Sequence, residues 1–400
     1  MTTALVPARC SHRELLSPVP FGHAAPDAIV VSATRQAAAL RETAEVAAKL
    51  GSLVVVLCSR SATAAGFGDL AARIPNLRWL AIDLPAGYGH PLFDFATSRI
   101  DEAKAARLGD LSMKRNLGLV LAKLAGWRRL MFLDDDITGL VPAQLRRAAA
   151  GLGSLDMIGL EVRDFPDNSV VCHANRMAGA KQDTFVSGSA LLVDSDRADA
   201  FFPDIYNEDW LFLFPSVQRR RVGRTGSVRQ LPYDPFARPS RAVGEEFGDV
   251  FAEGLMELAH SLLPQETAGT PEFWDRFLDG RRRLIAEAAD GIACGDPTIT
   301  ALEAAIALEA AEARRASIHA RALSKYLHTW HEDLAVWRSR LGDLCATSLT
   351  AALDSLDLSA VGETRERKTH GRLRGRTDRQ QRDGRANRRN RRPLPAPAGR

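Results

Sequence analysis

The sequence of 400 residues has five cysteines, and none of them stand at CxxC spacing. Their odd number and wide separation give neither a zinc-binding pattern nor a disulfide framework, and such use of cysteine is typical of a reducing compartment. No apolar run approaches the roughly 20 residues that a membrane-spanning helix needs. The N-terminus lacks the charged-then-apolar layout of a secretory signal. We therefore expect a soluble, cytoplasmic protein.

Several nucleotide-binding and hydrolase motifs are also missing. There is no GxxxxGK[ST] loop and no GxSxG turn, which argues against P-loop and α/β-hydrolase chemistry. The first apolar run is followed by Ala33-Thr34-Arg35-Gln36 in place of GxGxxG, which disfavours a dinucleotide-binding fold.

Positive charge is concentrated at one end of the chain. Residues 363–400 contain 14 Lys/Arg and 4 Asp/Glu, which gives this segment a net charge of +10. The rest of the chain carries −6, so the formal net charge of the whole chain is +4. This tail has almost no large apolar side chains to offset its ordering entropy, so we expect disorder. Clustered arginines attract phosphate groups, but the tail lacks aromatic residues for base stacking, so nucleic-acid binding is disfavoured.

Strand-like and helix-like stretches alternate in the first third of the chain. Helical composition and spacing occur at 36–50 and 113–125. Short apolar runs of strand type occur at 28–32, 52–57, 77–84 and 129–133. This alternation predicts an α/β fold, in which a mostly parallel sheet is flanked by helices.

The later part of the chain changes character. Further short strands are expected at 157–162, 169–172 and 185–193, and helices at 250–263, 271–289 and 298–341. The expected organisation is a poorly ordered leader at 1–26, a main α/β domain at 27–248, a helical extension at 249–361 and a disordered basic tail at 362–400.

Three consecutive carboxylates, Asp134, Asp135 and Asp136, follow the run at 129–133. A parallel strand that ends in this way places them at the carboxyl edge of the sheet, where ligands bind in open α/β folds. Adjacent like charges repel unless a cation or hydrogen-bond donors lie among them. Carboxylate ligands of this kind suit Mg²⁺ or Mn²⁺. A solvated acidic loop or helix cap is the alternative interpretation.

The segment 114–136 resembles the GT-A fold glycosyltransferases, in particular family 2-like members. Their common pattern is an Ala/Lys-Arg-Asn-x-Gly-Leu helix that leads into a Phe-Leu-Asp-Asp-Asp strand end. The matching residues here are Arg115, Asn116, Gly118, Leu119, Phe132, Leu133, Asp134, Asp135 and Asp136. The resemblance covers roughly residues 28–260. It implies a GT-A type nucleotide-diphospho-sugar transferase fold with a nucleotide-sugar half at about 27–140, an acceptor half at about 141–248 and a C-terminal helical extension.

The resemblance also implies residue roles. Asp134 would contact the nucleotide ribose or the metal, Asp136 would be the main metal ligand, and His260 would complete the metal sphere. Asp209 would take the proton of the acceptor, with Glu208 in support. The donor would contact Thr34, Arg35, Ser59, Arg60, Lys114, Arg115, Asn116, Asp134, Asp135 and Gly188. Purely structural alternatives stay open: a helix cap for Thr34, a strand bulge at Gly188, a helix N-terminus for 208–209 and a packing role for His260.

Two departures from the family pattern bear on nucleotide recognition. Leu57-Cys58-Ser59-Arg60 stands where many members have Asp-Asp-Gly-Ser, and Ala33-Thr34-Arg35 replaces Pro-x-Tyr-Asn. The nucleotide, the sugar and the acceptor therefore stay open, as does assembly into a homo-oligomer.

The expected function is that of a hexosyltransferase, which moves a sugar from a nucleotide-diphosphate donor to an acceptor hydroxyl with Mn²⁺ or Mg²⁺ and with inversion. A sugar-phosphate nucleotidyltransferase is the enzymatic alternative, although the Gly-rich, Lys/Arg-containing loop that such enzymes often carry is missing. The other alternative is a non-catalytic interaction protein whose Arg-rich tail binds nucleic acid.

Overall fold

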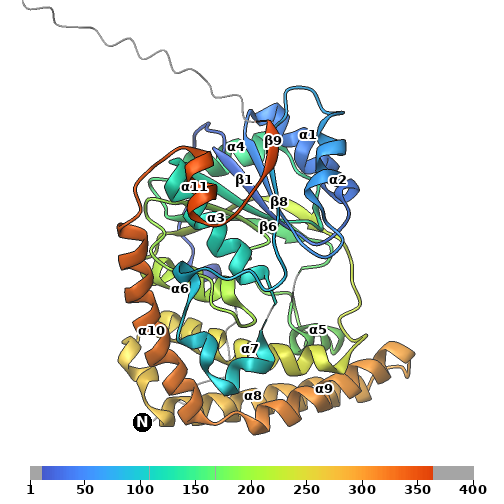
Figure 1. Ribbon diagram of the computed structural model, residues 1–400. Coiled ribbons are helices and arrows are strands. Elements are labelled where there is room, and N and C mark those ends of the chain that lie inside the picture. The colour runs from blue at the N-terminus through green and yellow to red at the C-terminus, as the bar shows by residue number, and fades with distance from the viewer. Residues whose placement is uncertain (1–10, 108, 167, 364–400) are drawn as a thin grey trace, which may run out of the picture. The chain divides into compact units, whose positions relative to one another are not determined.

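The computed structural model describes residues 11–107, 109–166 and 168–363 of the chain (Figure 1). Residues 1–10 of the expected leader and 364–400 of the expected tail lie outside the described residues. No helix in the described part of the chain is both long enough and apolar enough to cross a membrane.

The strands form one mixed sheet in the order β5-β8-β6-β7-β4-β1-β2-β3-β9. The four neighbours β3, β2, β1 and β4 are parallel, whereas β7 runs antiparallel between β4 and β6. The strand bounds are β1 (Ala28–Ala33), β2 (Leu53–Cys58), β3 (Arg78–Asp83), β4 (Arg129–Asp134), β5 (Ile137–Thr138), β6 (Met157–Arg163), β7 (Ala190–Asp194), β8 (Val222–Gln230) and β9 (Val361–Glu363). The predicted α/β class and the first four predicted strands are thus confirmed, but the sheet is more mixed than the sequence indicates.

Eleven α-helices occur in the described part of the chain. Their bounds are α1 (Arg41–Leu50), α2 (Ala64–Ala71), α3 (Leu111–Ala125), α4 (Pro142–Gly151), α5 (Val170–Met177), α6 (Glu208–Gln218), α7 (Pro239–His260), α8 (Pro271–Ala293), α9 (Ile299–Ser317), α10 (Ala320–Gly342) and α11 (Leu349–Ser355). The strand predicted at 169–172 is wrong, because the Ser169 side chain accepts the backbone N–H of Cys172 and caps α5 instead.

The two faces of the sheet are covered by different helices. Every residue of β1 and β2 is buried, as expected for parallel strands that are covered on both sides. Ile29 and Val31 pack with side chains of α1, α2 and α4, whereas Val30 packs with α3 and α6. Gly118 lets α3 approach the sheet closely, since a Cβ there would lie 2.8 Å from the ring of Phe132.

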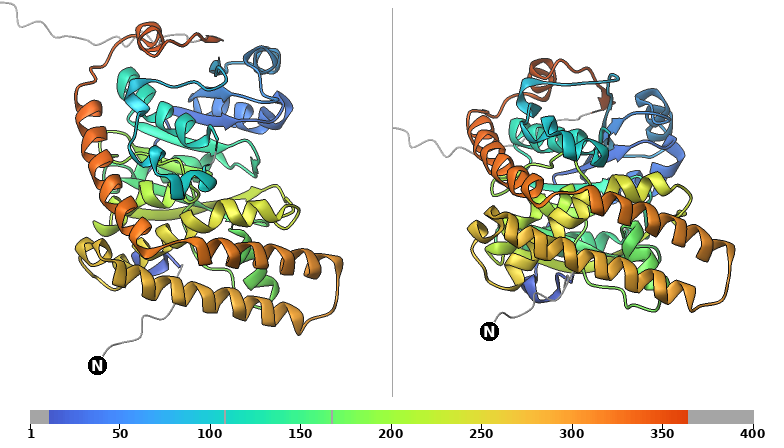
Figure 2. Two further views of the ribbon diagram at one scale, coloured as in Figure 1. Left: turned by 60° about the horizontal axis from the view of Figure 1, so that its bottom comes forward. Right: turned by 90° about the horizontal axis from the view of Figure 1, so that it is seen from below.

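The helices α8 and α10 share the main hydrophobic core, whereas the buried side chains of α9 form a smaller cluster with α5 and α8. Trp274 of α8 and both Trp330 and Trp337 of α10 are fully buried in the large cluster that also holds the α3 and α6 side chains. Figure 2 shows α8 and α9 side by side. The chain then returns to the sheet, where β9 pairs antiparallel with β3. The expected boundary at residue 249 therefore falls inside α7.

Residues 11–26, which we expected to be loosely ordered, pack against the sheet. The backbone N–H of Ser17 donates to the carbonyl of Val222 at 2.8 Å, and Leu15 is fully buried. The imidazole of His12 is buried against the ring of Trp210, with 4.3 Å between ring centroids. A few anchoring side chains thus hold a proline-containing segment that has no regular period of its own.

Candidate active site

The aspartate run lies at the carboxyl edge of the parallel strands, as the sequence predicts. Asp134 is the last residue of β4 and pairs in register with Ser32 of β1. Asp135 connects the loop after β4 to the loop after β1, because its Oδ2 accepts the backbone N–H groups of Thr34 at 2.6 Å and Arg35 at 2.8 Å. Its Oδ1 accepts Nη1 of Arg35 at 3.2 Å. Asp135 is therefore engaged by the chain itself.

Asp136 lies beside Asp135 and contacts Arg35 and Gln230 over longer distances. Its Oδ2 accepts Nη2 of Arg35 at 3.4 Å and Nε2 of Gln230 at 3.3 Å. The Asp136 side chain is 14% exposed, against 8% for Asp135. Arg35 itself is 45% exposed, so its charge reaches the solvent next to the aspartate run.

Arg115 of α3 joins the aspartate run to a second pair of carboxylates. Its Nη2 donates to both oxygens of Asp134 at 3.0 Å, and its Nη1 is bonded to Oε1 of Glu208. The guanidinium also lies 5.6 Å from the ring centroid of Phe202. The carboxylates come from β4 and α6, which are far apart in sequence, so one buried cation holds them at a fixed separation.

Glu208 and Asp209 form the first turn of α6. Asp209 accepts the backbone N–H of Gly188 at 2.6 Å and that of Trp210 at 2.8 Å. Burial raises the pKa of Glu208 to about 8, and burial also raises the pKa of Asp209. The largest opposing influence in both cases is the positive charge of Arg115, and hydrogen bonds from backbone N–H groups also lower both pKa values.

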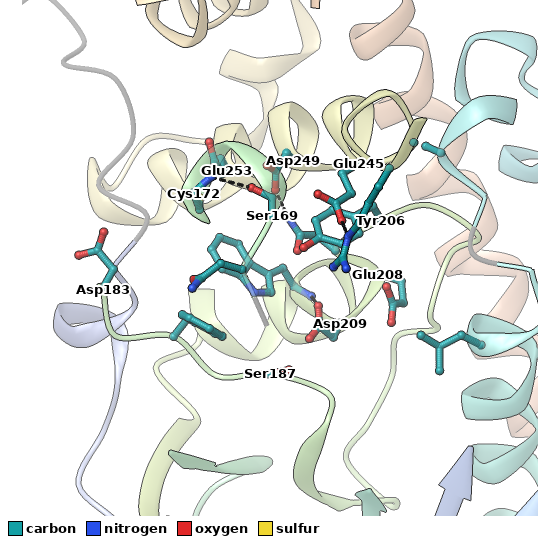
Figure 3. Close-up of a pocket in the computed structure, with 18 of the residues that line it drawn as sticks. Ser169, Cys172, Asp183, Ser187, Tyr206, Glu208, Asp209, Glu245, Asp249 and Glu253 are labelled. Atoms are coloured by element: carbon teal, nitrogen blue, oxygen red, sulfur yellow. Dashed lines mark hydrogen bonds and ion pairs between the residues drawn. The ribbon is translucent and has the colours of Figure 1, made fainter. Parts of the chain in front are cut away.

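A cavity of about 530 Å³ lies next to these groups (Figure 3). Asp134, Arg115, Glu208 and Asp209 contribute to its lining. The remaining walls come largely from α5, α7 and the segment 181–187. Most of the lining residues thus belong to the range 141–248 that the resemblance assigns to the acceptor half, while Arg115 and Asp134 belong to the other half.

Other predicted donor residues are bound to the chain itself. Nζ of Lys114 donates to the carbonyl of Ala33 at 2.9 Å and to Oγ of Ser59 at 2.7 Å, and burial lowers the pKa of Lys114. Asn116 exchanges two hydrogen bonds of 2.8 Å with the backbone of Phe202. Lys114 and Asn116 therefore fix α3 against its neighbours. Arg60 follows β2 with a left-handed backbone, φ 56°, and also lies outside the cavity lining.

His260 is placed away from the aspartate run. It is the last residue of α7, it influences the buried His12 electrostatically, and its Nε2 has no hydrogen-bond partner among the described residues. Among the residues that the structure describes, the one group of three His, Cys, Asp or Glu side chains with ligand atoms within 4.8 Å is Cys172, Asp249 and Glu253. The structure therefore does not bring His260 together with Asp134 and Asp136.

The Cys172 group was not singled out in the sequence. Its two carboxylates already bind a cation of the chain, since Arg281 donates to Asp249 at 2.7 Å and to Glu253 at 3.1 Å. The third carboxylate of this buried network is Glu246, and the spacing of three and four residues along α7 also occurs on ordinary exposed charged helix faces.

The aspartate run fits one kind of metal site. Asp134 and Asp136 retain side-chain exposures of 21% and 14%, so each has access to solvent. Two such carboxylates match a Mg²⁺ or Mn²⁺ ion that takes one or two protein ligands and completes its coordination with phosphate oxygens and water. They do not match a cage built from protein ligands alone.

No protein-family model and no curated protein matches this chain. Among solved structures, it is similar to the mannosyltransferase PcManGT from Pyrobaculum calidifontis in complex with GDP-Man and Mn²⁺. The similarity covers 81% of this chain and 92% of that one, with 14% sequence identity and a TM-score of 0.40.

Proposed function

We propose that the chain is a glycosyltransferase that moves a sugar from a nucleotide-diphosphate donor to an acceptor hydroxyl. The observation that carries this proposal is the position of Arg115, which binds Asp134 at the end of β4 and Glu208 at the start of α6 in the wall of a cavity of about 530 Å³. Transfer with inversion uses a group that takes the proton of the acceptor hydroxyl, and carboxylates beside the diphosphate can hold a divalent cation. The sequence pattern at 114–136 supports the same assignment.

On the donor side, Asp134 orients the nucleotide and Asp136 holds a divalent cation. When bound, Mn²⁺ or Mg²⁺ neutralises negative charge on the diphosphate leaving group. Asp135 fixes the backbone of Thr34 and Arg35 beside this position. The half-exposed guanidinium of Arg35 then offers a positive charge to the diphosphate.

On the acceptor side, the cavity orients a hydroxyl group toward the sugar. A carboxylate of the pair Glu208 and Asp209 takes the proton of this hydroxyl as its oxygen attacks the anomeric carbon from the face opposite the diphosphate. Such a displacement inverts the configuration. The family resemblance assigns this proton to Asp209.

The test is turnover of a panel of nucleotide-sugars (UDP-glucose, UDP-N-acetylglucosamine, GDP-mannose and dTDP-glucose) with Mn²⁺, measured as release of the nucleoside diphosphate. UDP and GDP should raise the thermal midpoint of the protein, and more so with Mn²⁺, because a ligand of the native state stabilises it. Asp136→Asn should remove the Mn²⁺-dependent part. Asp279→Asn is the matched control, because this exposed aspartate on α8 lies outside the cavity lining.

The alternatives predict different results. Release of pyrophosphate from a nucleoside triphosphate and a sugar phosphate, without turnover of nucleotide-sugars, would favour a nucleotidyltransferase. Deletion of residues 364–400 could remove all measurable function while Asp136→Asn has no effect on it. That combination would favour an interaction protein. No thermal shift with any nucleotide and no turnover would contradict the proposal.

A further inference from the structure

The cavity has carboxylates at the end where the proposed transfer takes place. Asp134, Glu208 and Asp209 line this end, and Arg115 binds the first two of them. Three carboxylates around one cation leave a net negative charge when all of them are ionised. A hydroxyl group can approach such a wall, whereas an anionic group is repelled by it.

The wall formed by α5 and the segment after it carries positive charge. Arg176, which is half-buried, and Lys181, which is exposed, both line the cavity, as does Asn175. Among the described residues, none of these three side chains has a hydrogen-bond or ion-pair partner. A cation in the last turn of a helix is favourable by itself, which accounts for Arg176. It does not account for Lys181, because α5 ends at Met177.

Other arginines of the cavity wall differ from this pair, because they have acidic partners in the chain. Arg241 of α7 is paired with Glu245, one turn further along the same helix. Arg107 lies 3.9 Å from a carboxylate oxygen of Asp204. The charges of these arginines are therefore balanced before any ligand enters.

The acidic residue Asp183 lies close in sequence to the unpaired cations. Its charge is countered by Arg13, which lies outside the cavity lining and influences Asp183 electrostatically. Figure 3 shows Asp183 on the opposite side of the cavity from Glu208. The positive wall and the carboxylates of the transfer site are thus at different ends of one cavity.

From this distribution of charge we infer that the acceptor is a small hydroxylated molecule that carries an anionic group, a phosphate or a carboxylate. This inference rests on the proposed transfer function and names the acceptor class that the function leaves open. Arg176 and Lys181 bind the anionic group, and the amide of Asn175 donates to it, because charged donors form the strongest hydrogen bonds to such oxygens. A cavity of about 530 Å³ lies within the range of roughly 300–1,000 Å³ that is usual for small-molecule sites.

The two ends of the cavity also fix the direction in which the acceptor binds. The cations attract its anionic group, and the carboxylates at the other end repel that group. The hydroxyl end of the acceptor is therefore the end that reaches the sugar. A neutral acceptor of the same size lacks this orienting force and leaves the two cations without a partner.

The first experiment compares matched acceptors on the wild-type protein, with the nucleotide-sugar that it consumes. Glucose is set against glucose 6-phosphate and glucuronate, and glycerol against glycerol 3-phosphate, so that phosphate and carboxylate are tested separately. Release of nucleoside diphosphate above the rate with water gives kcat/KM, which should be about tenfold or more higher for an anionic acceptor than for its neutral partner. The anionic acceptors should also raise the thermal midpoint more than the neutral ones. If neither turnover nor midpoint favours the anionic member of any pair, the inference is wrong.

The second experiment removes the two cations together. The double variant Arg176→Gln/Lys181→Gln should reduce the ratio of anionic to neutral kcat/KM by about tenfold or more, and should reduce the midpoint shift with the anionic acceptors. Arg176→Lys/Lys181→Arg keeps both charges and should retain most of the preference. Arg276→Gln/Lys325→Gln is the matched control, because these exposed cations of α8 and α10 lie outside the cavity lining. A preference that survives in the Gln double variant would overturn the assignment of these residues.

Failure of this inference and failure of the proposed function give different results. A wild-type protein that transfers sugar equally well to neutral and anionic acceptors disproves the inference and leaves the transfer function intact. A wild-type protein that consumes no nucleotide-sugar and shows no midpoint shift with UDP or GDP disproves the function. In that case the midpoint shifts with the matched acceptors still decide whether the cavity binds an anionic group.

Discussion

Arg115 and Glu208 form an ion pair in which neither side chain is more than 5% exposed. The same guanidinium binds both oxygens of Asp134, and Asp209 lies close enough to influence it electrostatically. One cation thus balances three carboxylates from β4 and α6. Without it, three negative charges would face each other in a largely buried region, which is strongly unfavourable.

Replacement of this cation should therefore destabilise the protein. We expect Arg115→Met to lower the free energy of unfolding by about 3–5 kcal/mol at pH 9, above the raised pKa of Glu208, as for other buried ion pairs that lose one partner. The loss should shrink at pH 5, where the raised pKa of Glu208 and of Asp209 lets them take up protons. Urea unfolding at both pH values measures this, with Arg282→Met on the exposed side of α8 as control. An equal loss at both pH values would contradict this electrostatic explanation.

The buried glutamates also make stability depend on pH. The pKa of Glu208 is raised from its ordinary value of 4.5 to about 8, and that of Glu245 to about 7. Above pH 4.5 the folded protein therefore binds more protons than the unfolded chain. The contribution of these two glutamates to the free energy of unfolding is fully present below pH 4.5 and is lost as the pH rises through 7 and 8. The thermal midpoint should fall from pH 6.5 to pH 8.5, above the range in which the lowered pKa values of His12 and His173 act in the opposite direction, and Glu208→Gln should reduce the slope. A wild-type midpoint that rises over this range would be inconsistent with raised pKa values.

Substitution of Asp135 should affect stability, whereas substitution of Asp136 should affect nucleotide binding. Asp135→Asn should lower the free energy of unfolding by about 1–3 kcal/mol. The –NH₂ group of the asparagine side chain is a donor and cannot accept the backbone N–H groups of Thr34 or Arg35 that Asp135 accepts. Asp136→Asn should leave stability nearly unchanged and weaken Mn²⁺-dependent nucleotide binding. Thermal midpoints with and without UDP or GDP and Mn²⁺ distinguish the two variants. Equal effects of both substitutions on stability and on binding would argue against this division.

The local part of the fold could be predicted from the sequence, because its signals are short in range. Buried runs such as 28–32 and 129–133 predict strands, and the aspartates that follow the second run predict a site at the sheet edge. Both strands are present, and Asp134 is the last residue of β4. The assignment of particular contacts could not be read in this way. Lys114 and Asn116, which match the family pattern, bind the chain's own backbone instead of facing the cavity.

The parts of the fold that could not be predicted from the sequence depend on long-range packing. The contact of His12 with Trp210 joins residues nearly 200 positions apart, and no local period marks it. The same holds for the return of β9 to β3 after the C-terminal helices. The buried network of Arg281 with Glu246, Asp249 and Glu253 looks in the sequence like an ordinary charged helix face. Only the packing of α8 on α7 turns these charges inward.

Gly188 offers a last test of the arrangement, because a single methyl group there meets the site directly. A Cβ at this position would lie 2.6 Å from Nη1 of Arg115 and 2.9 Å from Cβ of Asp209, closer than side-chain atoms pack. Gly188→Ala should therefore push Arg115 off Glu208, lower the thermal midpoint and reduce turnover of the nucleotide-sugar by about tenfold or more. Gly342→Ala is the matched control, because a Cβ there, at the end of α10, meets no other atom within 4 Å. If Gly188→Ala keeps both the midpoint and the turnover of the wild-type protein, Arg115 and Asp209 are not held as closely around Gly188 as the contacts indicate.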